Sequence, residues 1–172
     1  MPEHRFPNLQ QVKFRVSCLA VALLALSACS GGDSTYTLAA AGPWKLSHGK
    51  NTRAGIALAV KEINSVGGIN GHKLVIKDAD DNADGVKAAQ IAQRFVDDAS
   101  ISAVIGHVTS GAMVAAAKVY DGHLPALATS ASSPDLTGIS PWAFRVISSD
   151  SANGVAIATF ASRTGHRRAA IL

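Results

Sequence analysis

Two short apolar runs in the middle of the sequence, residues 103–106 and 125–128, are each followed at once by small hydroxyl side chains. If the runs are neighbouring parallel strands, their carboxyl ends open onto one crevice, and ligands of open α/β sheets bind in such a crevice. Hydroxyl and backbone groups there could hold a small polar molecule without any covalent chemistry. The two loops are therefore the candidate binding site.

Ser110 and Gly111 stand where the first run passes into a predicted helix. The Ser110 hydroxyl and the free N–H groups of the first helical turn could all donate to an anion, and the helix dipole adds to the field. A carboxylate is the natural ligand for such a site. The alternative is that Ser110 only caps its own helix, as serine often does.

The second loop has the sequence Ser130-Ala131-Ser132-Ser133-Pro134. Its hydroxyl and carbonyl oxygens could accept from an ammonium group, and Ser132 could share a carboxylate with the first loop. The alternative is an ordinary serine-rich loop, in which Ser132 or Ser133 helps to start a turn before the proline.

Enzyme chemistry and metal binding find little support in the sequence. His107 and Ser110 could suggest a base and a nucleophile, but the nucleophile-elbow spacing is missing and no carboxylate partner is evident. Asp80–Gly85 has the opening spacing of a calcium loop, but Ile91 stands where a bidentate glutamate is required, which favours a helix-capping loop. The six histidines are dispersed. We therefore expect neither an enzyme nor a metal site.

No cofactor or nucleic-acid partner is expected either. No Gly-x-Gly-x-x-Gly motif follows the first predicted strand, so a dinucleotide is not indicated. The formal net charge is +4, but lysine and arginine are scattered rather than clustered, so the sequence lacks the basic patch that nucleic-acid binding requires.

Alternating strands and helices must position the two loops. Apolar periodicity and turn residues predict strands over 36–41, 73–78, 103–106, 125–128 and 169–172, an extended segment over 140–146, and helices over about 52–66, 85–97, 110–120 and 153–163. Asn51 and Asp84 are candidate caps of the first two helices, and Trp44–Lys50 is predicted to be a loop. This order predicts an α/β fold with a parallel, doubly wound sheet and right-handed crossovers.

The pattern of the first 28 residues is typical of a targeting segment. Basic residues precede the apolar run 16–26, which is well short of the roughly 20 residues that span a bilayer. Leu26-Ser27-Ala28-Cys29 resembles the lipobox of bacterial lipoproteins, which predicts a signal peptide over 1–28, a lipid anchor on Cys29 and a tether over 29–35. The alternative is an ordinary secretory signal with a chance cysteine. Either reading places the rest of the chain outside the cytoplasm, and the first predicts a lipid-anchored periplasmic protein.

From Gly42 onward the sequence resembles the periplasmic Leu/Ile/Val-binding proteins of branched-chain amino acid ABC transporters, which are type I periplasmic binding proteins. The resemblance is carried by Lys61–Asn64 before Gly67–Gly71, by Asp80-Asp81, by Val104–His107 and by Ser133–Thr137. It implies a solute-binding protein that captures an amino acid between two α/β lobes and docks to an inner-membrane permease.

The resemblance also implies roles for individual residues. Ser110 would bind the ligand carboxylate, Ser130 and Ala131 would supply main-chain contacts, and Ser132 would touch both charged groups of the ligand. The loop that holds Trp44 and His48 would shape the side-chain pocket, with His48 in place of a family tyrosine.

Residues 36–147 would form the first lobe, and 148–172 would be the first helix and strand of an incomplete second lobe. A full member of the family would be about twice as long, so we expect a truncated protein or a partial reading frame that binds amino acids weakly or not at all by itself. The rival interpretations are a ligand-sensing receptor of the same fold for amides or urea-like solutes, and a non-functional truncated remnant.

Overall fold

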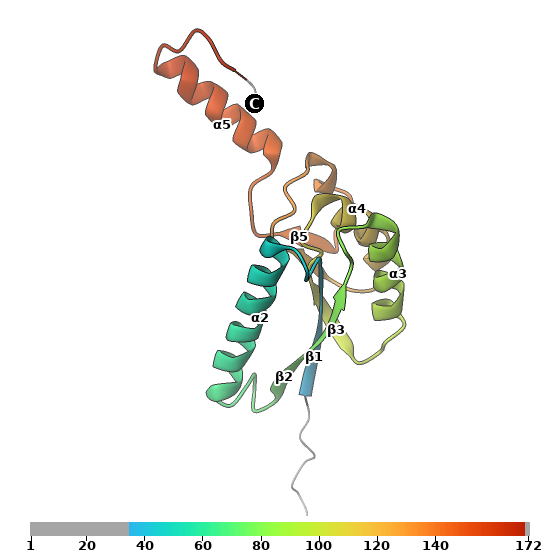
Figure 1. The fold of residues 1–172 in the computed structure, drawn as a ribbon. Helices are drawn as coiled ribbons and strands as arrows, with labels where there is room; N and C mark the ends of the chain where they lie inside the picture. The colour runs from blue at the N-terminus through green and yellow to red at the C-terminus, as the bar shows by residue number, and fades with distance from the viewer. Residues whose placement is uncertain (1–34, 171–172) are drawn as a thin grey trace, which may run out of the picture. The chain divides into compact units, whose positions relative to one another are not determined.

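The computed structural model describes residues 35–170 and contains a five-stranded, wholly parallel sheet (Figure 1). The signal peptide, Cys29 and nearly all of the tether lie outside the described residues. The strand order is β2-β1-β3-β4-β5. The strands are β1 (Thr35–Gly42), β2 (Lys73–Asp80), β3 (Ile101–Ile105), β4 (Ala126–Ala128) and β5 (Ala143–Arg145). The predicted parallel α/β sheet is confirmed.

Helices cover both faces of this sheet, so it is doubly wound. Figure 1 shows α2 on one face, and α3 and α4 on the other. The helices are α2 (Ser47–Ser65), α3 (Gly85–Val96), α4 (Ser110–Tyr120) and α5 (Asp150–Arg163), and a short 3-10 turn, η1, spans Pro134–Leu136.

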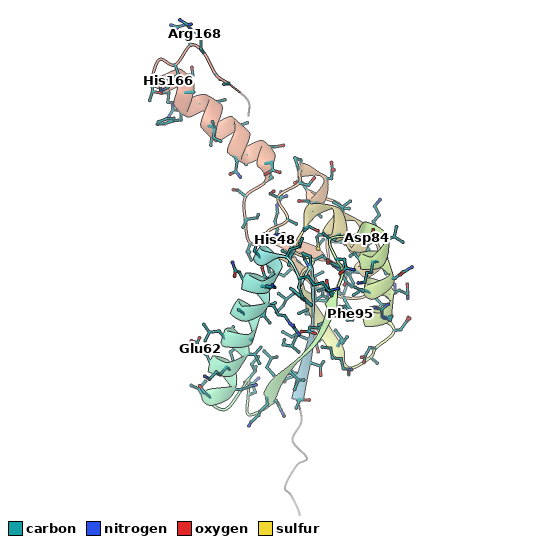
Figure 2. The ribbon with its side chains drawn as sticks, viewed as in Figure 1. His48, Glu62, Asp84, Phe95, His166 and Arg168 are labelled. Atoms are coloured by element: carbon teal, nitrogen blue, oxygen red, sulfur yellow. The ribbon has the colours of Figure 1, made fainter. Side chains whose placement is uncertain are left out.

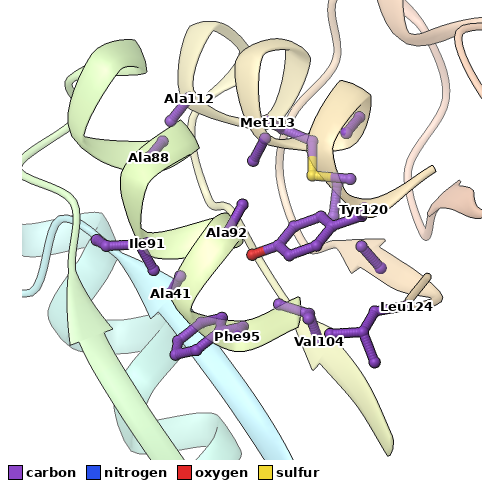
Figure 3. Close-up of a cluster of buried hydrophobic side chains, with 14 of the residues drawn as sticks. Ala41, Ala88, Ile91, Ala92, Phe95, Val104, Ala112, Met113, Tyr120 and Leu124 are labelled. Carbon is purple, nitrogen blue, oxygen red and sulfur yellow. The ribbon is translucent and has the colours of Figure 1, made fainter. Parts of the chain in front are cut away.

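The main core lies between the sheet and the α3–α4 pair, where small strand residues let the helices approach closely. Ala39 and Ala41 of β1 point into this core, whereas Ala40 between them packs with Trp44 and Val108 on the α2 side. Figure 3 shows the larger side chains that fill it, including Ile91, Phe95, Met113, Tyr120 and Leu124.

The first helix was predicted incorrectly at its start. α2 begins at Ser47, inside the expected Trp44–Lys50 loop, and Leu46 rather than Asn51 is its N-cap. The backbone of buried Gly49 packs directly against the Pro43 carbonyl, so the turn after β1 leads straight into the helix. Asn51 is therefore an exposed residue of the early helix and caps nothing.

Two other helix starts follow from their caps. The Lys87 N–H donates to the Asp84 carboxylate at 2.7 Å, which confirms the predicted cap of α3. The Ala152 N–H donates to Ser149 Oγ at 3.2 Å, and α5 therefore begins at Asp150, three residues before the expected start. The strand expected over 169–172 is not formed at residues 169–170, and the last two residues lie outside the described part.

The α2 face of the sheet is only partly covered. Strand alternation points Ile105, Leu127 and Phe144 to this face, and the parallel register aligns them in one row across β3, β4 and β5. Leu127 is 38% exposed and Phe144 is 54% exposed. No residue of α5 is buried. None of the helices in the described part is long and apolar enough to cross a membrane.

Candidate functional site

The loops that follow β1, β3 and β4 meet at the carboxyl edge of the sheet. The chain order reverses between β1 and β3, and this topological switch point is where open α/β sheets bind ligands. β3 and β4 are hydrogen-bonded neighbours, with Ile105 opposite Leu127 at their carboxyl ends. The structure thus brings the two hydroxyl-rich loops together, as the sequence predicts.

Ser110 joins the two loops through its hydroxyl oxygen. The backbone N–H groups of Ser132 and Ser133 both donate to Ser110 Oγ, each at 3.2 Å. Ser110 is the first residue of α4 and does not cap it, because Thr109 is the N-cap residue and makes no side-chain capping bond. The capping alternative is therefore contradicted. The oxygen uses both acceptor positions, and no group among residues 35–170 accepts its hydrogen, so this hydrogen is available to a ligand.

The other two serines of the site, Ser130 and Ser132, donate their hydroxyl hydrogens to groups of the protein itself. Ser130 Oγ donates to the Val108 carbonyl at 2.9 Å and forms a second bridge between the loops. Ser132 Oγ donates to an Asp150 carboxylate oxygen at 3.0 Å, and the Asp150 N–H donates back to the Ser132 carbonyl at 2.9 Å. Ser132 is therefore tied to the start of α5.

The two non-hydroxyl residues of the predicted contact set occupy different environments. Ala131 is fully buried and its side chain belongs to the main core, so only its backbone can face a ligand. Gly111 is exposed in the first turn of α4, where helical N–H groups have no partner within the helix.

Trp44 and His48 do not share one environment. The Trp44 ring is buried beside Val108, in the same loop that leads to Ser110, and its backbone N–H donates to Asp80 Oδ1 at 3.2 Å. His48 lies exposed at the start of α2 (Figure 2). A cleft of about 630 Å³ opens between α2 and the sheet, and it is lined by Trp44 together with Ala40, Lys50, Arg53, Ala54, Ile56, Ala57, Ile76 and Asp78.

Three buried polar atoms in these loops have no hydrogen-bond partner among residues 35–170: Trp44 Nε1, Thr109 Oγ1 and Thr129 Oγ1. They belong to the loops after β1, β3 and β4 respectively. Nearly all buried polar groups in proteins are paired, so these three atoms are available to partners from outside the described residues. Thr109 and Thr129 were not predicted to contact a ligand, although each hydroxyl follows directly after a predicted strand.

A second polar cluster, which the sequence did not predict, is formed by His107, Asp81 and Tyr120. His107 Nδ1 lies 2.7 Å from Asp81 Oδ2, and His107 Nε2 lies 3.1 Å from the Tyr120 hydroxyl. All three side chains are buried. His107 therefore does have a carboxylate partner, 26 residues away in the sequence, but its other nitrogen faces Tyr120 and not Ser110.

Burial raises the pKa of Tyr120 far above its usual value, and the negative charge of Asp81 raises it further. The phenol therefore stays protonated and remains a hydrogen-bond donor. Within the described residues, no group of three or more histidine, cysteine, aspartate or glutamate side chains is arranged to hold a metal ion.

Comparisons with known proteins agree on one family. A family model described as "Periplasmic binding protein" matches residues 36–172. An "Amino acid binding protein" of Pseudomonas aeruginosa is 34% identical over 153 residues, which cover 83% of this chain and 40% of that protein. "Leu/Ile/Val-binding protein homolog 1" of Brucella abortus is 33% identical over 109 residues, which cover 62% of this chain and 29% of the relative.

Solved structures give the same result. The ABC transporter substrate-binding protein of Desulfitobacterium hafniense in complex with Leu superposes with a TM-score of 0.71 at 36% identity, over 77% of this chain and 40% of that one. A second similar structure is the branched-chain amino acid transporter substrate binding protein LivJ of Streptococcus pneumoniae in complex with isoleucine. It gives a TM-score of 0.62 at 30% identity, over 69% of this chain and 35% of that one. This chain therefore spans at most about 40% of the length of these proteins.

Proposed function

Because this chain belongs to the periplasmic binding protein family, we propose that it is the extracytoplasmic solute-binding component of an ABC importer and that it captures amino acids of the branched-chain type. The proposal is supported by relatives named for amino acids, leucine, isoleucine and valine, and by similar structures that hold leucine and isoleucine. Its partner would be a permease in the inner membrane.

The observation that carries this proposal is the state of the Ser110 hydroxyl. Two backbone N–H groups fix its oxygen between the loops, and its hydrogen is left to donate. The N-terminus of α4 adds backbone donors, including that of Gly111, and a positive dipole end. Together these groups suit the carboxylate of an amino acid, because every one of them donates.

The remaining groups of the site suit the rest of an amino acid. The unpaired Thr129 hydroxyl and the carbonyls of Ser130 and Ala131 offer oxygens to an ammonium group. The buried Trp44 ring beside Val108 supplies apolar surface for a branched side chain, and His48 would border it from the exposed start of α2. Ser132 would contribute through its hydroxyl, by exchanging Asp150 for the ligand, while its N–H stays bonded to Ser110 Oγ.

We also propose the domain organisation inferred from the sequence. Residues 36–147 would be the first lobe and 148–172 the beginning of the second, with Ser132 and Asp150 in contact across that boundary. A signal peptide over 1–28, a lipid on Cys29 and a tether over 29–35 would hold the protein at the periplasmic face of a membrane.

The test is an NMR titration of the 172-residue chain with L-leucine. We expect the amide signals of Ser110, Gly111 and residues 129–132 to shift over the millimolar range. L-Leucinamide keeps the ammonium group and the side chain but lacks the carboxylate, so it should leave these signals unmoved. Ser110→Ala should abolish the leucine response, whereas the matched control Ser102→Ala, an exposed residue on β3, should preserve it.

Three results would contradict the proposal. The first is an equal response to leucine and leucinamide, since the carboxylate would then not be recognised. The second is a leucine response that survives in Ser110→Ala. The third is a response to acetamide or urea at these signals without any response to leucine, which would favour the sensor alternative.

A further inference from the structure

Three hydrogen-bonding side chains meet inside the main apolar core. Asp81 and His107 are 0% exposed and Tyr120 is 1% exposed. They come from three separate segments: the loop after β2, the loop after β3, and the last turn of α4. Burying such groups is costly unless every donor and acceptor is paired, and hydrophobic side chains of similar volume could fill the space without that cost.

The geometry pairs all of these groups in one arrangement. The Ala83 N–H donates to Asp81 Oδ1 at 2.8 Å, and the other carboxylate oxygen faces His107 Nδ1 at 2.7 Å. The carboxylate can only accept, so Nδ1 carries a hydrogen. Nε2 is then the acceptor for the Tyr120 hydroxyl at 3.1 Å. With a protonated ring, the Tyr120 hydroxyl hydrogen would have no acceptor among the described residues.

The chain from His107 to Ser110 connects this cluster to the candidate site. The His107 backbone N–H donates to Met113 Sδ at 3.3 Å, and its ring is held from both sides. Val108, the next residue, packs against Trp44 and accepts from Ser130. Ser110 follows two residues later. Fixing the His107 ring therefore fixes the start of the short loop that ends at Ser110.

We propose that Asp81, His107 and Tyr120 are positioning residues, which hold the loop from 107 to 110 so that Ser110 Oγ lies where it accepts from the opposite loop and donates to the ligand. The ligand part of this inference rests on the proposed function. The positioning of Ser110 against Ser132 and Ser133 does not, because it concerns hydrogen bonds within the chain.

The first experiment determines the tautomer of His107 by long-range ¹H–¹⁵N NMR on the 172-residue chain. We expect a neutral ring with its hydrogen on Nδ1, and a low-field signal for that hydrogen because it is shared with the Asp81 carboxylate. A ring with its hydrogen on Nε2 would overturn the proposed arrangement. This measurement uses the unaltered chain, so its result does not depend on whether any substituted protein folds.

The second experiment uses Tyr120→Phe, which removes only the hydroxyl. We expect hydrogen exchange at the Ser132 and Ser133 amides to accelerate by about two- to tenfold, the effect of losing one hydrogen bond of ordinary strength, beyond any acceleration shared by the amides of β1. Ile91→Val is the matched control, since Ile91 lies in the same core but outside the cluster. It should accelerate exchange only through global unfolding.

Equal acceleration in the two variants, once corrected for global stability, would mean that Tyr120 serves packing alone, and it would overturn the positioning role. The exchange measurement needs no ligand. If leucine fails to bind while the exchange pattern is as expected, the proposed function fails and the positioning of Ser110 stands. If leucine binds and the exchange pattern is absent, only the positioning role fails.

Discussion

Single hydroxyl groups distinguish the serines of the two loops. Ser130 and Ser132 donate to Val108 and Asp150, whereas Ser110 only accepts. A hydroxyl group has one hydrogen. A serine that donates this hydrogen to another group of the protein therefore cannot donate it to a ligand at the same time. Ser110 is therefore the serine best prepared for a carboxylate, and Ser132 must break its contact with Asp150 before its hydroxyl can take part.

Tyr120 gives a pH prediction at the same scale. Burial, assisted by the charge of Asp81, raises its pKa well above the ordinary value of 10.0. The folded protein therefore holds the phenol proton more tightly than the unfolded chain does. This contribution to stability is complete below about pH 10 and is lost as the pH rises further, because deprotonation then favours the unfolded chain.

The prediction can be measured in Tyr36→Phe, in which Tyr120 is the only remaining tyrosine. Tyrosinate absorbance should appear only together with the loss of the circular dichroism signal in an alkaline titration. Ionisation near pH 10 with an intact dichroism signal would show that the phenol is accessible and would contradict the burial argument.

At the scale of elements, the start of α2 depends on one close backbone contact. Gly49 is buried, and a Cβ atom at this position would meet the Pro43 carbonyl oxygen. Gly55 lies in the same helix, is exposed, and has open space where its Cβ would be. Gly49 therefore meets backbone in the first turn of α2, whereas Gly55 faces open space in the interior of the same helix.

We expect opposite effects of the same substitution at these two positions. Gly49→Ala should lower the free energy of unfolding by about 1–3 kcal/mol, because the added methyl group must displace backbone in a packed region. Gly55→Ala should raise it by roughly 0.5–1 kcal/mol, since alanine loses less backbone entropy than glycine on entering a helix. Urea denaturation measures both values. A neutral Gly49→Ala would mean that the Pro43 turn can move away at little cost.

At the scale of the whole molecule, the two faces of the sheet are unequally covered. The face under α3 and α4 holds the main core, whereas the opposite face carries the row of Ile105, Leu127 and Phe144, in which Leu127 and Phe144 are exposed. Exposed apolar rows of this kind bind hydrophobic molecules, because their contact with water is unfavourable.

This row should bind the dye anilinonaphthalene sulfonate in the folded state. We expect Leu127→Ser combined with Phe144→Ser to reduce the dye fluorescence clearly, with little change in the urea midpoint since both side chains are already part-exposed. Val66→Ser is the control, because Val66 is 84% exposed at the end of α2 and lies outside the row. An equal loss of fluorescence in Val66→Ser would show that the row is not the binding surface.

The sequence alone determined the class of the fold and the adjacency of the two hydroxyl-rich loops. Alternating apolar runs and amphipathic helices require a parallel sheet with helices on both faces, and the structure has that sheet. The Asp84 cap was also predictable, since its partner Lys87 lies three residues away. The hydroxyl loops were located correctly because parallel strands place their carboxyl ends at one edge.

Only the tertiary structure decided what each polar group in those loops does. Ser110 accepts from Ser132 and Ser133, 22 and 23 residues away, and His107 meets Asp81 at a separation of 26. Periodicity and capping rules describe only neighbours along one element. They therefore allowed Ser110 to be a cap of its own helix, and they gave His107 no partner. The free hydrogen of Ser110 and the fixed ring of His107 both depend on contacts between elements. These contacts exist only once the sheet has assembled.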